Sequence, residues 1–468
     1  MLETVLVKLL GYGVFWNSRT RQHFRSKAFA GIISVRRFVW RSSLKSVPRS
    51  EGERLVERCV SIFGIPIFVR RSQRARYRVA LLVDEFFGGW DTAIGGYGAL
   101  ARKYICRFIP DDLIQIDLLL DVDVHGWYGV RRKLVDQTMI YRLPSNVLQR
   151  QEWLDNQAFD LFLSIEMTLA SFNIISTYET NTPLLYWIQD PRDLTLYRSR
   201  LRTVDRLKDA DWAYIKDVSI WIQEMIRQKR VLFISQGVSL STIAREMYQI
   251  SNTVPIRDLA NPIEIEFDYK LDDPPKQNKI IFLGRLEAQK RVWIFCKIAQ
   301  AMPQYEFYIL GATGRGRNEA ANAKTLEEYR NRDGSSKIAN LHFIGHVDGD
   351  VKNSHIKTAK LLLNTSIWEG IPVSWLEALS YGTLIVSAFD RDNIAARFGT
   401  FVGEVMGDGT DEMSIRTFAN AIEYWMTHDL ERRTAAQLAI DFIRARHPIK
   451  AFTEKMRAEI LKAIQPGA

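Results

Sequence analysis

The amino-acid sequence predicts two α/β domains of the doubly wound type, preceded by a basic extension. From Tyr77 onward, short apolar runs alternate with longer stretches of helical period, which is typical of parallel strands covered by helices. A stretch rich in turn-forming residues, 261–275, interrupts this pattern and marks a boundary between two domains. The chain has 468 residues, of which 47% are hydrophobic and 25% charged, so it is long enough for both domains and is not a disordered or fibrous protein.

The extension, residues 1–76, carries the positive charge of the chain. Residues 1–78 contain 17 Lys and Arg residues against four acidic residues, whereas the formal net charge of the whole chain is only +10. The rest of the chain is therefore slightly acidic. We expect no nucleic-acid partner, because the basic excess does not extend into the predicted domains.

Apolar and aromatic side chains are interleaved with the arginines of the extension, and this composition suits a segment that lies on an anionic bilayer. We predict that residues 1–70 bind an anionic membrane surface, which would place the protein in the cytoplasm, at the inner face of the cell membrane. The alternatives are a solvated basic arm, ordinary helical packing and an organelle targeting peptide. The best apolar run, residues 1–16, contains charges and glycines and is shorter than the roughly 18 residues of a membrane-spanning helix.

The three cysteines, Cys59, Cys106 and Cys296, lie far apart in the sequence and form no Cys-x-x-Cys spacing. This spacing favours neither a disulfide framework nor a zinc site, and it is consistent with a reducing compartment.

The N-terminal α/β domain is predicted to span residues 77–265. Its strands are expected at 78–84, 114–120, 160–165, 184–189 and 231–235. Ligands of doubly wound domains bind beyond the carboxyl ends of such strands. Three glycines, Gly95, Gly96 and Gly98, follow the first strand and open a helix, so they would allow a ligand to approach the backbone closely, although a plain turn is the alternative.

The C-terminal α/β domain is predicted to span residues 266–445. Its strands are expected at 279–283, 306–310, 340–344, 360–364 and 383–387, with helices at 287–301 and 375–381. Residues 446–468 form a last helical segment that comes after all the strands and can lie against either domain.

The first candidate site loop follows the strand 279–283. Gly284 permits a sharp turn, and Arg285 and Lys290 lie five positions apart at the start of a helix, where both can converge on an anion. Such a pair suits a diphosphate leaving group. The alternative is that both cations are solvated and that Glu287 pairs with Lys290 on the helix surface.

The second candidate loop follows the strand 360–364. Pro372 suits the first position of a helix, and Gly370, which has no side chain, keeps the loop before that helix narrow. The amides of Ile371 and Val373 would therefore point toward a phosphate. Glu369 lies on the loop and Glu377 lies more than one turn into the helix. These two carboxylates would accept hydrogen bonds from different hydroxyl groups of one extended ligand.

Together these motifs resemble the retaining glycosyltransferases of family 4, whose signature is E-x7-E and whose fold, GT-B, has two Rossmann-like domains that face across a cleft. The resemblance covers residues 279–387 and, more loosely, 77–235. It implies that Arg285 and Lys290 hold the diphosphate of a nucleotide sugar, that Glu369 binds the transferred sugar, and that Glu377 binds the ribose. Donor-binding roles also follow for Gly284, Gly370, Ile371, Pro372 and Val373, and Gly95, Gly96 and Gly98 correspond to the N-terminal glycine loop of the family.

The same resemblance implies retention of anomeric configuration without a metal or other cofactor, the leaving phosphate accepting the proton of the acceptor. A saccharide or lipid-linked acceptor, used in the synthesis of surface polysaccharide or lipopolysaccharide, would fit the predicted membrane location.

One position departs from the family pattern. Where members often carry a histidine beside the donor sugar, this sequence has Gln189 and Asp190, which could bind sugar hydroxyls but supply no imidazole. Because of this departure, an alternative is that the protein is a non-catalytic scaffold in a membrane glycan-assembly complex. A further alternative is a metal-dependent transferase of the single-domain GT-A type, in which Asp121 and Asp123 would chelate the cation.

Overall fold

The computed structural model describes residues 53–465, except 63–64, 75–76, 124–128, 177, 179, 193, 205–213 and 314–322. Residues 1–76 and 77–468 are two separate units. In the first unit, β1 (Glu53–Ile62) and β2 (Ile65–Arg74) form an antiparallel hairpin that the sequence did not predict. Most of the predicted membrane-binding segment, 1–70, lies outside the described residues.

The N-terminal domain is built on an eight-stranded sheet with the order β10-β9-β8-β7-β3-β4-β6-β5. The five predicted strands are β3 (Tyr77–Leu82), β4 (Ile114–Asp123), β7 (Leu161–Ile165), β8 (Leu184–Ile188) and β9 (Val231–Ser235). These strands pair in parallel, and their carboxyl ends meet at one edge of the sheet. The three strands that were not predicted are β5 (Arg131–Val135), β6 (Thr138–Pro144) and β10 (Ile256–Asp258).

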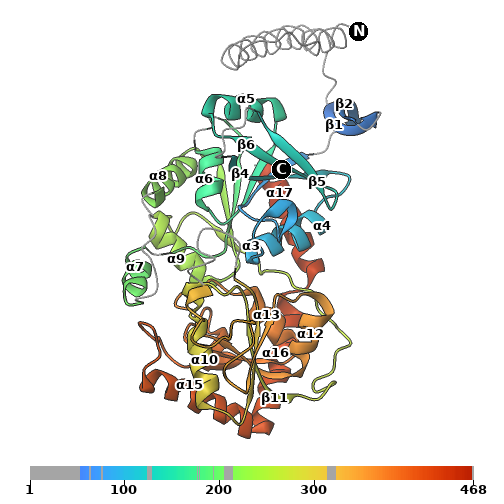
Figure 1. The fold of residues 1–468 in the computed structure, drawn as a ribbon. Coiled ribbons are helices and arrows are strands. Elements are labelled where there is room, and N and C mark those ends of the chain that lie inside the picture. Colours follow the sequence, from blue (N-terminus) through green and yellow to red (C-terminus); the bar gives the residue numbers. More distant parts are fainter. Residues whose placement is uncertain are drawn as a thin grey trace, which may run out of the picture. The chain divides into compact units, whose positions relative to one another are not determined.

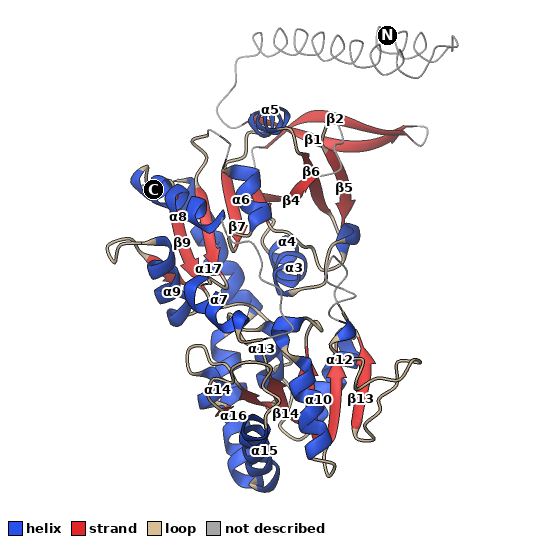
Figure 2. Ribbon diagram, turned by 60° about the vertical axis from the view of Figure 1, so that its left-hand side comes forward, coloured by secondary structure: helices blue, strands red, loops and turns tan. Residues whose placement is uncertain are grey.

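Helices cover both faces of this sheet (Figure 2). The glycine loop leads into a continuous helical stretch made of α3 (Gly96–Ala99), a π-helical segment (Leu100–Ile105) and α4 (Cys106–Phe108). The other helices of this domain are α5 (Val147–Gln157), α6 (Leu169–Ile175), α7 (Leu194–Arg202), α8 (Tyr214–Arg227) and α9 (Val238–Tyr248).

The C-terminal domain has a six-stranded parallel sheet with the order β13-β12-β11-β14-β15-β16. The five predicted strands are β11 (Gln277–Leu283), β12 (Glu306–Leu310), β13 (Leu341–Gly345), β14 (Ala359–Asn364) and β15 (Leu384–Ser387), and β16 (Gly399–Phe401) is an added edge strand. Its helices are α10 (Val292–Ala301), α12 (Gly349–Thr358), α13 (Val373–Ser380), α14 (Ile394–Arg397), α15 (Glu412–Thr427) and α16 (Asp429–Arg446).

The helix predicted at 287–301 begins later than expected, at Val292. Residues 288–290 form a 3₁₀ turn, and Arg291 then takes a left-handed conformation with a φ of 46°. A non-glycine residue rarely adopts this conformation inside a helix, so the regular helix starts only after it.

The last helix, α17 (Ile449–Ile464), packs against the N-terminal domain (Figure 1). Phe452, Met456 and Ile460 recur every fourth residue, so they lie on one helix face, and all three are buried with the apolar residues of β3, β7 and β8. The ring of Phe452 stacks on that of Trp187, with the ring centroids 5.4 Å apart. The chain therefore crosses from the C-terminal domain back to the N-terminal domain at its end.

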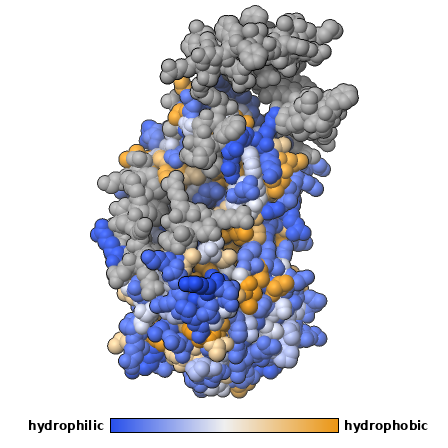
Figure 3. Space-filling model, in the orientation of Figure 1, coloured by the Kyte–Doolittle hydropathy of each residue, from blue (hydrophilic) through white to orange (hydrophobic). Residues whose placement is uncertain are grey.

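On the face of the molecule drawn in Figure 3, hydrophilic side chains predominate and the hydrophobic ones form separate patches. Within the described residues, no helix combines the length and the apolar character that crossing a membrane requires.

Candidate functional site

A cavity of about 620 Å³ lies between the two α/β domains, at the carboxyl ends of their central strands. Its walls include the glycine loop after β3, the loops after β11 and β14, and the start of α13. All but one of the site residues predicted from the sequence line it: Gly95, Gly96, Gln189, Asp190, Gly284, Arg285, Lys290, Glu369, Gly370, Ile371, Pro372, Val373 and Glu377. Gly98 lies in α3 and is not part of the cavity wall, because its position is packed against the backbone of Phe87 and the side chain of Glu85.

The glycine loop is closed over a buried carboxylate, Glu85. A Cβ atom at Gly95 would lie 2.2 Å from an Oε atom of Glu85, and one at Gly98 would lie 2.4 Å from the amide nitrogen of Phe87. Gly96, in contrast, has open space where a side chain would be. Two of the three glycines therefore serve close packing inside the protein, and Gly96 leaves the backbone accessible from the cavity.

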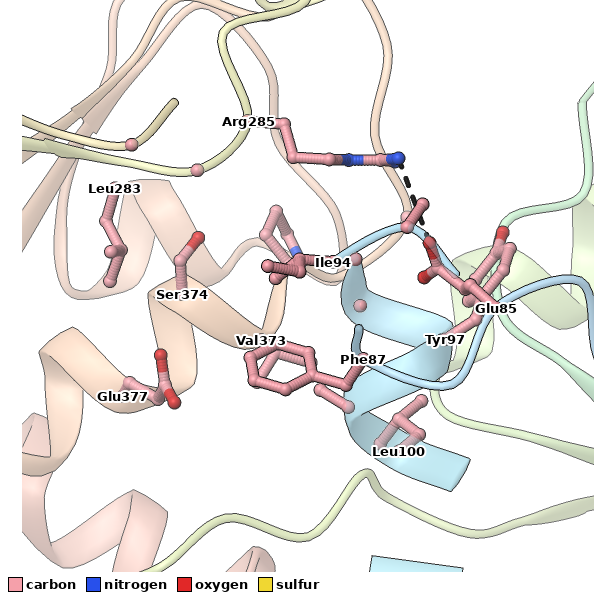
Figure 4. Close-up of a pocket in the computed structure, with 18 of the residues that line it drawn as sticks. Glu85, Phe87, Ile94, Tyr97, Leu100, Leu283, Arg285, Val373, Ser374 and Glu377 are labelled. Carbon is pink, nitrogen blue, oxygen red and sulfur yellow. Dashed lines mark ion pairs between the residues drawn. The ribbon is translucent and has the colours of Figure 1, made fainter. Parts of the chain in front are cut away.

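Sequence reasoning missed Glu85, which lines the cavity at the end of β3. Its Oε1 accepts a hydrogen bond of 2.9 Å from the amide of Gly98, and its Oε2 lies 3.8 Å from Nη1 of Arg285 (Figure 4). Burial raises the pKa of this carboxyl to about 7, even though the charge of Arg285 acts in the opposite direction. The signal in the sequence was an acidic residue directly after a buried strand and ahead of a glycine loop.

Arg285 follows Gly284 in the loop after β11, and its guanidinium lies between two carboxylates. Nη1 is 3.1 Å from Oε1 of Glu287 and 3.8 Å from Oε2 of Glu85. Burial lowers the pKa of Arg285, but the charges of Glu287 and Glu85 outweigh it, so the pKa lies above its ordinary value. Arg285 therefore stays charged at the cavity wall.

Lys290 pairs with Glu369 across the two site loops, so the alternative pair of Glu287 with Lys290 does not form in the described structure. Nζ of Lys290 lies 2.5 Å from Oε1 of Glu369, which also accepts a hydrogen bond of 2.6 Å from the Ser366 hydroxyl. The hydroxyl of Thr365 donates to the carbonyl oxygen of Lys290 at 2.7 Å. The loop after β11 and the loop after β14 are therefore fixed against each other.

Arg291 is the buried anchor behind this pair of loops. Its guanidinium donates to the backbone oxygens of Thr365, Val405 and Gly407 at distances of 2.7 to 3.0 Å. Burial lowers the pKa of Arg291 to about 10, a value at which it still carries its charge at neutral pH. The left-handed backbone at Arg291 turns this side chain inward, while Lys290 faces the cavity.

Glu377, on α13, takes part in a chain of ion pairs that crosses the cavity wall. Nζ of Lys352 lies 2.6 Å from Oε1 of Glu377 and 3.3 Å from Oδ1 of Asp348. Oδ2 of Asp348 in turn lies 2.5 Å from Nζ of Lys103, in the N-terminal domain. Burial alone would raise the pKa of Asp348, but the two lysines lower it to about 2. The position of Glu377 is thus set by charges from both domains.

Gln189 and Asp190 line the cavity, yet their side chains already have partners in the protein. The amide group of Gln189 exchanges two hydrogen bonds with Asn261, at 3.0 and 2.9 Å. Asp190 accepts from Arg192 at 2.9 Å and from the indole N–H of Trp368, in the other domain, at 3.0 Å. A sugar hydroxyl would therefore have to share or replace these bonds.

Glu166 is a second buried carboxylate that sequence reasoning missed, and it fixes the backbone of Gln189 and Asp190. It accepts hydrogen bonds from the amides of Gln189 and Asp190 at 2.9 and 2.7 Å, and from the hydroxyl of Tyr186. The backbones of Gly370 and Gln189 are closely packed, because a Cβ atom at Gly370 would lie 2.3 Å from the carbonyl oxygen of Gln189. Glycine at this position allows the loop after β14 to meet the N-terminal domain.

The charges that line the cavity are balanced. Its described walls contain five cationic side chains and five carboxylates: Lys103, Arg192, Arg285, Lys290 and Lys352, and Glu85, Asp190, Asp348, Glu369 and Glu377. The cavity therefore offers cations for an anionic group and carboxylates that can accept hydrogen bonds from hydroxyl groups.

The described residues contain no group of three or more His, Cys, Asp or Glu side chains that could hold a metal ion. Asp121 and Asp123, the ligands of the metal-dependent alternative, lie at the end of β4, and their side chains lie outside the described part of the chain.

Comparison with known proteins gives one family and several relatives. Residues 264–439 match the family described as glycosyl transferases group 1. The lipopolysaccharide 1,6-galactosyltransferase of Salmonella typhimurium is 22% identical over 253 residues, which are 53% of this chain and 61% of that protein. The O-antigen biosynthesis glycosyltransferase WbnH of Escherichia coli is 29% identical over 129 residues, 28% of this chain and 30% of that protein. The chain thus matches less than two thirds of the length of either relative.

Solved structures match over most of the described fold. The sucrose-phosphate synthase of Thermosynechococcus elongatus superposes with a TM-score of 0.64 at 13% identity, covering 84% of this chain and all of that one. Alr3699/HepE of Anabaena, solved in complex with UDP, gives a TM-score of 0.55 at 13% identity and covers 82% of this chain and all of that one. These matches confirm the predicted GT-B fold, with two Rossmann-like domains, and not the single-domain GT-A alternative.

Proposed function

We propose that this chain is a retaining glycosyltransferase of the family 4 type, which transfers a sugar from a nucleotide diphosphate sugar to a saccharide or lipid-linked acceptor. The observation that carries the proposal is the meeting of Arg285, Lys290, Glu369 and Glu377 on one wall of the interdomain cavity, opposite the glycine loop. All four residues fall within the stretch that matches the glycosyl transferases group 1 family.

The donor diphosphate would bind between the two site loops. Arg285 and Lys290 supply positive charge there, and the amides of Ile371 and Val373, around the start of α13, supply hydrogen-bond donors. Glu369, held by Lys290, is placed for the hydroxyls of the transferred sugar. Glu377, one turn into α13, is placed for the ribose.

In the transfer step, the bond between the anomeric carbon and the diphosphate oxygen breaks while a bond forms to the acceptor oxygen on the same face. The proton of the acceptor hydroxyl passes to the leaving phosphate, so the step needs no protein nucleophile and, in this proposal, no metal or other cofactor. Arg285 and Lys290 would stabilise the negative charge that develops on the leaving group.

The cellular role is proposed from the names of the relatives and from the composition of the extension. Two curated relatives are named for lipopolysaccharide and O-antigen synthesis. We therefore infer a role in surface polysaccharide or lipopolysaccharide synthesis, with residues 1–70 holding the protein at the anionic inner face of the cell membrane.

A turnover screen of UDP-, GDP- and dTDP-sugars, measured as nucleotide release with and without a chelator, tests this proposal. Release from at least one donor, unchanged by the chelator and lost in an Arg285→Ala variant, is the expected result. Failure to bind any nucleotide or nucleotide sugar would favour the non-catalytic scaffold, and activity that requires added manganese would contradict the metal-independent step.

A further inference from the structure

Glu85, a carboxylate of the N-terminal domain, lies against the cation that we assign to the donor diphosphate. Its carboxyl group sits under the glycine loop, with Oε1 bonded to the amide of Gly98 and Oε2 3.8 Å from Arg285 (Figure 4). The close approach of Gly95 covers the carboxyl, and the side chain is 8% exposed. The proposed transfer step does not use this residue.

Carboxylates outnumber cations around the proposed diphosphate position. Arg285 lies close to both Glu85 and Glu287, and Lys290 is paired with Glu369. A diphosphate adds further negative charge to this cluster. Because the Glu85 side chain is only 8% exposed, water screens its charge poorly, and a buried carboxyl relieves repulsion from like charges by accepting a proton.

We propose that Glu85 is part of the donor site and takes up one proton from solvent when a diphosphate binds to Arg285. The inference rests on the proposed function, since it requires a nucleotide sugar at Arg285. A carboxylate only accepts hydrogen bonds, whereas a protonated carboxyl also donates one. Binding would therefore change Glu85 from a competitor for Arg285 into a group that can donate toward the bound diphosphate.

Glu85 is better suited to this role than the other carboxylates of the cluster. Burial raises its pKa to about 7, Arg285 lowers it, and Asp84 and Glu287 raise it further. A diphosphate that neutralises Arg285 would remove the one favourable charge, so the pKa would rise above 7 on binding. Glu369, in contrast, keeps the direct contact with Lys290.

Isothermal titration calorimetry of the full chain with UDP-glucose, GDP-mannose and dTDP-glucose tests the inference, because the diphosphates of these sugar nucleotides do not titrate near neutral pH. Titrations at about pH 7.5, in two buffers that differ in ionisation enthalpy, measure the protons taken up. For the wild type we expect uptake of up to about three quarters of a proton, because about one quarter of Glu85 is already protonated at this pH, and an affinity that falls by up to about tenfold for each pH unit above pH 7.

Glu85→Gln keeps the size of the side chain and an acceptor for the Gly98 amide, so we expect it to bind with little proton uptake and with an affinity nearly independent of pH. The matched control is Glu287→Gln, which removes the other carboxylate near Arg285, a more exposed one outside the cavity walls. This control should retain the proton uptake.

Binding without proton uptake by the wild type would overturn the inference, and so would equal uptake by the wild type and Glu85→Gln. The wild-type result needs no substitution, so a poorly folding variant would not leave the question open. If none of the three donors binds, the proposed function fails together with this inference. If one binds without uptake, only the inference fails.

Discussion

Arg285 keeps its positive charge although it lies largely within the cavity wall, because Glu287 and Glu85 offset the effect of burial. If this charge stabilises the leaving diphosphate, Arg285→Ala should lower turnover about 100-fold or more, as loss of one transition-state donor does. Nucleotide release at saturating donor and acceptor measures the effect. The side chain is 35% exposed, so the substitution should change the free energy of unfolding little. Near-normal turnover in a folded variant would show that Arg285 has no part in the mechanism.

The two glutamates of the E-x7-E pattern should have separable effects. Glu377→Gln should weaken the binding of the free nucleotide, because Glu377 is assigned to the ribose. Glu369→Gln should mainly impair use of the intact sugar donor. Titration with free nucleotide and turnover with the sugar nucleotide, measured on both variants, distinguish the two roles, and equal losses of nucleotide affinity would contradict the assignment.

The residues of the site could be predicted where a short stretch of the chain contains the whole pattern. Gly284, Arg285 and Lys290 lie within seven positions, and Glu369 and Glu377 lie within nine, so spacing along the chain indicated them. Their partners could not be predicted in this way. Asp348 meets Lys103, which is 245 positions away, and such a contact depends on how the two domains dock.

At the scale of the elements, five adjacent parallel strands of each domain were predicted because each is a short apolar run between helices, whereas β6, which pairs in parallel with β4, was missed. The strand β5 was missed because it contains Arg131, Arg132 and Lys133 and resembles a polar loop. Charged side chains are common on edge strands, where they prevent pairing with other chains, and β5 is the last strand of its sheet. The turn to β6 is formed by Asp136 and Gln137, which both have positive φ angles.

The junction between α16 and α17 contains a buried histidine that should make stability depend on pH. His447 is 4% exposed, and its Nδ1 lies 2.7 Å from the carbonyl oxygen of Asn261. Burial lowers its pKa to about 4, from an ordinary value near 6.5. The neutral form is therefore favoured in the folded state, and as the pH falls from about 6.5 to 4 the unfolded state gains a proton that the folded state does not.

We expect His447 to reduce the free energy of unfolding by about 3 kcal/mol over this range. Urea unfolding at about pH 7.5 and pH 4.5 measures the change, and His447→Gln, which keeps an N–H donor but does not titrate, provides the comparison. The variant should lose less stability than the wild type on acidification. Parallel losses in both proteins would show that other groups cause the pH dependence.

At the scale of residues 77–468, the cavity depends on contacts that join both domains. Besides α17, the indole of Trp368 donates to Asp190, and Asp392 accepts hydrogen bonds from the amides of Val238 and Ser239 at 3.0 and 2.8 Å, at the start of α9. These contacts place the glycine loop of one domain opposite the site loops of the other. They belong to one unit of the chain, and residues 1–76 form the other.

The last prediction concerns the extension, whose basic and aromatic composition motivates the membrane proposal. The full chain should co-sediment with anionic vesicles and poorly with neutral ones, and salt should release much of it, because exposed charges are screened within about 8 Å at physiological ionic strength.

A truncation at residue 70 would cut through β2 (Ile65–Arg74), so residues 1–76 should be removed as a whole. The truncated protein should lose vesicle binding and keep its affinity for nucleotide, since the proposed donor residues, Glu85 included, all lie in the unit 77–468. Undiminished vesicle binding would show that another surface is the anchor, and loss of nucleotide binding in a folded truncated protein would make residues 1–76 part of the catalytic body.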